Sequence, residues 1–116
     1  MGYALYIKRL EDELSISANE WHSLVDSDPS LRMIGRIEWT NPLGEVITYT
    51  NPHLAEWSDG DRSVPFDFRS GRVAVKPLDG KVLAKMLELA EKLSAQVVGD
   101  DGEFYTRDET HGIDIT

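Results

Sequence analysis

The segment from residue 66 to residue 105 constrains the fold more than any other part of the chain. Two short alternations of apolar and polar residues flank Ser70 and Gly71, a pair that permits the positive φ angles of a tight hairpin. A helix is predicted next, from an N-cap at Asp79 to about Leu93. A closing hairpin of strands 95–98 and 103–105 follows. The segment therefore indicates a framework of strands and one long helix on which other elements can pack.

Helical spacing divides this predicted helix into two faces. The apolar face comprises Val82, Leu83, Met86, Leu87, Leu89, Ala90 and Leu93, and the opposite face comprises Lys81, Lys85, Glu88, Glu91 and Lys92. We expect the apolar face to pack on a sheet and the charged face to meet water.

A second, shorter helix is predicted to begin at a capping box. The Ser17 side chain can accept from the backbone N–H of Glu20, and the Glu20 carboxylate can reach back to the Ser17 N–H. Ile16 and Trp21 are placed as a hydrophobic staple around this cap. The helix should end by Asp28, because a proline follows it.

The remaining segments alternate with period two. Residues 3–8 predict one strand, residues 33–50 a hairpin around Asn41 to Gly44, and residues 53–57 another short strand. Trp21 and Trp39 are in phase with apolar faces, which predicts that both lie in the core.

These elements predict a single α+β domain over residues 1–105. Its antiparallel sheet should have about five to seven strands and two helices, with the longer helix packed on one sheet face. A chain of 116 residues can bury a sizeable core without metals or disulfides. Residues 106–116 form a polar tail that we expect to fray.

Charge narrows the classes of partner. The chain has 12 Lys and Arg against 21 Asp and Glu, a formal net charge of -9. Phosphate backbones and anionic lipid would repel such a chain, so a basic protein partner is favoured over nucleic acid or a membrane. Acidity that only maintains solubility is the alternative. The absence of cysteine and of a long apolar run predicts a cytoplasmic protein.

The search for catalytic and metal-binding motifs is negative, so neither an enzyme nor a cofactor is predicted. His22, His53 and His111 lack the spacing of zinc ligands. No phosphate-binding glycine loop, Gly-x-Ser-x-Gly elbow or cysteine nucleophile occurs. Two acidic runs, 59–61 and 100–103, do not match a calcium loop and are explained by turn chemistry, with or without a partner-facing role.

The same two loops supply the candidate partner-binding residues. Trp57 lies beside the first acidic turn, and tryptophan beside charge is a common composition of interface hot spots. The candidates are Glu56, Trp57, Asp59 and Asp61 in one loop, and Asp100, Asp101 and Glu103 in the other.

Three segments carry a resemblance to a known family. ISANEWHSLVDSDPSLR, FDFRSGRVAVKP and AKMLELAEKLSAQVVGDDGEFY resemble small bacterial cytoplasmic proteins that occur beside polymorphic toxins and are regarded as immunity proteins. The resemblance covers most of residues 3–105. It implies an antitoxin that binds and blocks a cognate toxin domain by protein–protein contact, without catalysis. It transfers no binding residue to this chain.

Two alternatives remain open at this point. A small-molecule-binding or enzymatic α+β domain would require a deep polar pocket with perturbed carboxylates. An accessory domain would dimerise through a free sheet edge. The sequence is compatible with a monomer or a weak dimer.

Overall fold

The computed structural model describes residues 4–10, 14–77 and 79–106. Within these ranges it contains β1 (Leu5–Lys8), α1 (Ala18–Ser27), β2 (Leu31–Met33), β3 (Arg36–Thr40), β4 (Val46–Thr50), β5 (Leu54–Ser58), β6 (Ser63–Arg69), β7 (Arg72–Val75), α2 (Gly80–Lys92), β8 (Gln96–Gly99) and β9 (Phe104–Tyr105). The predicted α+β class is confirmed, and the polar tail from residue 107 onward lies outside the described residues.

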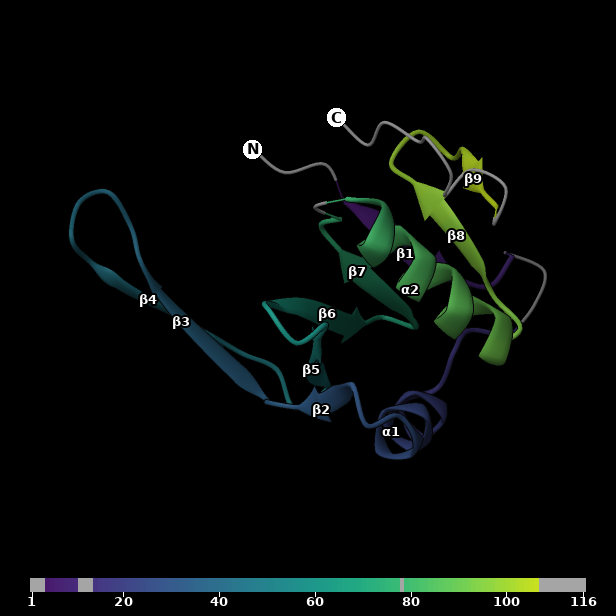
Figure 1. Ribbon diagram of the computed structural model, residues 1–116, viewed down its shortest axis with the longest axis horizontal. Coiled ribbons are helices and arrows are strands. Elements are labelled where there is room, and N and C mark those ends of the chain that lie inside the picture. The colour runs from purple at the N-terminus through teal and green to yellow at the C-terminus, as the bar shows by residue number, and fades with distance from the viewer. Residues whose placement is uncertain (1–3, 11–13, 78, 107–116) are drawn as a thin grey trace.

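Seven of the strands form one sheet in the order β2-β5-β6-β7-β1-β8-β9. Every neighbouring pair in it is antiparallel. The first strand of the chain, β1, lies between β7 and β8, so it pairs on both sides with strands that are distant from it in sequence. β3 and β4 pair only with each other, and Figure 1 shows this hairpin extending away from the rest of the molecule. We call residues 36–50 the arm.

Both helices lie on one face of the seven-stranded sheet, which we call the helix face. α2 contacts β1 and β8, and α1 contacts β2 (Figure 1). Alternate strand residues such as Ile7, Phe66 and Val73 point under the helices and are fully buried. Period-two alternation therefore predicts the core of this sheet correctly.

The helix starts also match the sequence. Ser17 and Glu20 form the predicted capping box, and Ile16 and Trp21 are both buried beside it. The Asp79 carboxylate accepts from the backbone N–H groups of Lys81 and Val82. None of the helices in the described ranges is long and apolar enough to cross a membrane.

The predicted start of the hairpin at residue 33 is wrong, because the hairpin strand begins at Arg36. Residue 33 ends β2 in the main sheet, and the chain turns out at Gly35, whose φ is 73°. Ile34 and Gly35 both donate to the carbonyl of Leu54, at 2.9 and 3.1 Å. The backbone N–H of Asn51 donates to the Gly35 carbonyl at 2.9 Å, so the chain leaves and re-enters the sheet at one point.

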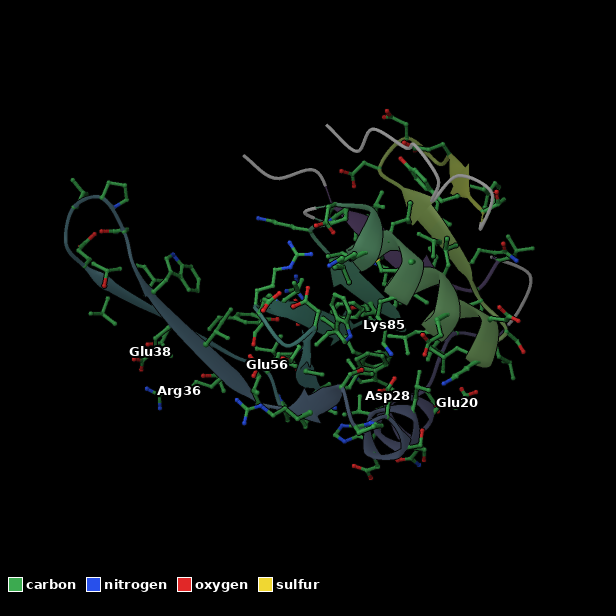
Figure 2. All side chains as sticks on the ribbon, in the orientation of Figure 1. Glu20, Asp28, Arg36, Glu38, Glu56 and Lys85 are labelled. Atoms are coloured by element: carbon green, nitrogen blue, oxygen red, sulfur yellow. The ribbon has the colours of Figure 1, made fainter. Side chains whose placement is uncertain are left out.

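Two side chains occupy environments that their periodicity does not predict. Trp39 is 49% exposed on the arm, because the arm's apolar face has no helix over it. Lys85, expected to face water, is only 9% exposed and donates to Asp28 at 2.6 Å. Figure 2 shows the Lys85 and Asp28 side chains pointing at each other between α2 and α1.

The opposite face of the main sheet, which we call the open face, has no helix over it among the described elements. The strand alternation that buries Phe66 and Val73 turns Asp67, Arg72 and Tyr6 to this side. Arm and open face together position the candidate site.

A candidate partner-binding groove

A groove of about 710 Å³ lies between the arm and the open face of the sheet. The arm contributes Ile37, Trp39 and Tyr49, and the sheet contributes polar and apolar residues that include Tyr6, Pro65, Asp67, Arg69, Arg72, Ala74 and Lys76. Its volume is within the range of sites that hold a small ligand or a few side chains of a partner.

The arm presents an apolar face to this groove because of its register. Ile37 pairs with Tyr49 and Trp39 with Ile47, so these four side chains share one face. Apart from Val46, the other face carries charged and hydroxyl side chains, including the ion pair of Arg36 and Glu38 seen in Figure 2. The arm is therefore an amphipathic hairpin with its apolar side turned inward.

Hydrogen bonds fix the base of the arm to the sheet. The Tyr49 hydroxyl donates to the carboxylate of Asp67 at 3.0 Å, and the Asn51 amide donates to the same carboxylate at 2.8 Å. The Asn51 amide also donates to the carbonyl of Phe68 at 2.9 Å. Burial and the neighbouring Asp67 both raise the pKa of Tyr49, so its hydroxyl keeps the proton that it donates.

Three cationic side chains line the groove. Arg69 and Arg72 are cross-strand partners on either side of the turn formed by Ser70 and Gly71, whose φ angles are 54° and 78°. The Arg72 guanidinium lies 4.6 Å from the centre of the Tyr6 ring, and that of Arg69 lies 5.7 Å from the Tyr49 ring. Lys76 follows on the same strand face. Cation–π contacts hold each guanidinium against an aromatic wall while leaving donors available.

One predicted contact residue lies next to the groove wall. The Tyr6 hydroxyl donates a hydrogen bond to the Asp100 carboxylate, and this bond, together with burial, raises the pKa of Tyr6. Asp100 and Asp101 are exposed, and the Asp101 N–H donates to Glu103 at 3.1 Å. The second acidic loop is thus accessible to a partner.

The first acidic loop is used mainly for internal contacts. Asp59 accepts from the backbone of Asp61 and from the backbone and side chain of Arg62. Arg62 also bonds Asp79, so it ties the turn to the start of α2. These bonds outweigh desolvation and lower the pKa of both Asp59 and Asp79, with the Asp61 N–H the largest influence on Asp59. Of the predicted residues here, Asp61 is exposed.

The two predicted residues of β5 are placed differently. Glu56 pairs with Arg32 at 2.7 Å on the neighbouring strand. Trp57 is 8% exposed and packs against Phe66, with ring centres 6.4 Å apart. The interface position suggested for Trp57 is corrected: register turns it to the helix face, so its ring belongs to the core.

The two acidic loops lie at the same end of the sheet but are not adjacent. Antiparallel pairing brings the ends of β5 and β8 to one side, with β6, β7 and β1 between them. Four strand spacings separate the loops by about 19 Å. One partner surface can reach both loops, but they do not form a single patch.

Carboxylates with strongly displaced pKa values serve structural roles outside the groove. The Arg9 guanidinium lowers the pKa of Glu20 to about 2. Burial raises the pKa of Asp28, but hydrogen bonds from Lys85 and Ser30 outweigh burial and lower it to about 2. These groups stay ionised near neutral pH and brace α1 against its neighbours.

Tertiary structure also brings together two histidines that the sequence separates. His22 Nε2 and His53 Nδ1 lie 2.8 Å apart, and the His53 ring packs on the edge of Phe68. No group of three possible metal ligands occurs within the described ranges, and His111 lies outside them. The pair is 31 residues apart, so spacing gave no signal of it.

The groove itself was missed by sequence reasoning. Its one local signal is the Arg-Ser-Gly-Arg turn, because a two-residue hairpin loop places the flanking arginines opposite each other. Trp39 lines the same groove as these arginines only because of the angle at which the arm leaves the sheet. The chain matches no family model, no curated protein and no solved structure.

Proposed function

We propose that the protein is a bacterial cytoplasmic immunity protein that binds and neutralises a cognate toxin domain by protein–protein contact, without catalysis. The observation that carries this proposal is the arm. A free two-stranded hairpin is marginal by itself, and large apolar side chains exposed on it gain little within the monomer. Trp39 is 49% exposed on the face turned to the groove, and Leu43 is 83% exposed at the tip of the arm. Val46, opposite Thr40, is 65% exposed on the other face. Such a surface is typical of an element that a partner covers.

Two further features support a protein partner. The sequence segments that resemble immunity proteins fall in α1, the β6–β7 hairpin and the α2–β9 region, which build the body that holds the arm. The net charge of -9 favours a basic toxin at long range. The exposed loop of Asp100, Asp101 and Glu103 can contribute to that attraction, as proposed from the sequence.

A small-molecule-binding protein is the second candidate, favoured by the volume of the groove. The four carboxylates with lowered pKa values, Glu20, Asp28, Asp59 and Asp79, are absent from its lining. A catalytic acid would need a raised pKa instead. We therefore rank this function below the first.

The test is co-expression with the product of the gene immediately upstream, as the candidate toxin, followed by purification of the complex and a growth-rescue assay. We expect the wild type to rescue growth, and Trp39→Ala with Leu43→Ser to weaken binding by at least about tenfold, a hot-spot-sized loss. The control, Leu14→Ser, removes an 87%-exposed apolar side chain from the loop that precedes α1 and should leave binding unchanged.

Failure of the wild type to bind or rescue would reject the immunity function. Equal losses in the arm variant and the Leu14 variant would reject the arm as the contact. Circular dichroism of each variant separates either result from unfolding.

A further inference from the structure

The groove has a charge opposite to that of the molecule. The chain has 21 acidic and 12 basic side chains, yet Arg69, Arg72 and Lys76 line the groove together with one described carboxylate, Asp67. Asp67 already accepts from Tyr49 and Asn51 and pairs with Arg69 at 3.3 Å. Arg72 and Lys76 form no ion pair with any residue in the described ranges. Asp100 lies beside Tyr6, whose ring holds Arg72, but Asp100 is not part of the lining. The lining of the groove therefore has more positive than negative charge.

The register makes this charge unfavourable for folding alone. Arg69 and Arg72 face each other directly across the β6–β7 turn. Like charges in that position destabilise a hairpin. An anion that bridges both guanidinium groups would remove this repulsion and form charge-assisted hydrogen bonds.

The walls beside the cations are apolar and aromatic. Tyr6 and Tyr49 hold the two guanidinium groups, and Trp39 closes the groove from the arm with half of its surface exposed. An occupant therefore needs carboxylates next to apolar side chains. A segment of a partner protein provides both along one stretch of chain.

We propose that the groove binds an acidic segment of the partner protein, with its carboxylates on Arg72, Lys76 and Arg69 and its apolar side chains against Trp39. This inference rests on the proposed function and names the chemistry of the contact. It also assigns two roles to charge: the acidic exterior attracts a basic toxin, and the basic groove receives that toxin's acidic segment.

A displayed library of random dodecapeptides tests the groove without the toxin. Peptides selected on the wild-type protein should be enriched in Asp and Glu beside apolar residues. Their affinity, measured by fluorescence anisotropy, should fall by more than about tenfold in Arg72→Glu with Lys76→Glu. The matched control, Lys81→Glu with Lys92→Glu, reverses two exposed cations on α2 and should bind within about twofold of wild type.

Trp39 provides a second readout. Peptides without aromatic residues should shift the emission of the wild type, and Trp39→Phe should remove the shift, because Trp21 and Trp57 are buried. Circular dichroism checks the fold of the charge variants, and Arg72→Gln with Lys76→Gln replaces the reversal if it unfolds.

Three results would overturn the proposal. The library could yield no binders, the binders could lack acidic residues, or their affinity could survive the groove variants. A dimer seen by sedimentation and lost in Arg72→Glu with Lys76→Glu would assign the groove to a second copy of this chain instead. Selection of acidic peptides without toxin binding would reject the immunity function but keep the groove as a site for acidic segments. Toxin binding without selection of acidic peptides would keep the immunity function but reject this role of the groove.

Discussion

At the residue scale, Asp28 and Lys85 form a buried ion pair on which we expect the stability of the fold to depend. Their side chains are 8% and 9% exposed, 57 residues apart in sequence, and 2.6 Å apart in space. Ser30 donates two further bonds to Asp28, at 2.6 and 2.9 Å. Removal of one partner from a buried pair leaves the other charge uncompensated, which costs more than the pair itself contributes.

We predict that Asp28→Asn lowers the free energy of unfolding by about 3 kcal/mol at pH 7. The pKa of Asp28 is lowered from 3.8 to about 2 in the folded state, so its stabilisation is present above pH 4 and is lost as pH falls toward 2. The difference between wild type and variant should therefore shrink over that interval, as measured by urea unfolding at several pH values.

Glu88→Gln is the matched control for that measurement. Glu88 also pairs with Lys85, at 3.1 Å, but its side chain is 42% exposed, so its loss should cost less than about 1 kcal/mol. A constant difference between wild type and Asp28→Asn down to pH 2 would contradict the assigned pKa.

At the scale of elements, the arm separates folding from binding. Its ends meet where the Asn51 N–H donates to the Gly35 carbonyl. A bond of this kind closes a four-residue turn when only two residues lie between donor and acceptor residues. Replacement of residues 36–50 by Gly-Asn would retain that bond. The lost contacts are those of Tyr49 with Asp67 and Arg69 and those of the arm's half-buried apolar side chains.

We predict that this deletion leaves the seven-stranded sheet folded, with the free energy of unfolding changed by no more than about 2 kcal/mol. Toxin binding should be lost. Amide spectra and urea unfolding test the first part, and titration with the toxin tests the second. A deletion variant that is unfolded would show that the arm belongs to the folding unit.

At the scale of the whole molecule, charge acts over distances longer than any contact. The net charge of -9 should accelerate association with a basic toxin, and salt should screen this attraction. We predict that the association rate falls by more than about tenfold between low and moderate salt, with little change in the dissociation rate, as measured by stopped-flow kinetics.

Location can be separated from total charge in the same measurement. Asp100→Asn with Asp101→Asn and Asp26→Asn with Glu91→Gln each remove two of the 21 acidic charges, so each changes the net charge from -9 to -7. A larger slowing by the first variant would place the second acidic loop near the interface. Equal slowing of association by both variants would show that only the net charge of the molecule matters, not the position of the loop.

The sequence by itself determined the local elements. Capping at Ser17 and Asp79, the turn at Ser70 and Gly71, and the alternation in β6 and β7 all depend on residues a few positions apart. Hydrogen bonds and steric limits over that distance are encoded in short windows, so these features and the α+β class could be predicted.

Only the tertiary structure decided which surfaces those elements cover. Alternation states that Trp39 and Trp57 each lie on an apolar face, but not that helices cover one face and solvent meets the other. The same limit applies to Lys85 and to the pair of histidines. The groove exists because sheet order and the angle of the arm bring Trp39 and Arg72 to the walls of one groove, and long-range packing alone sets both.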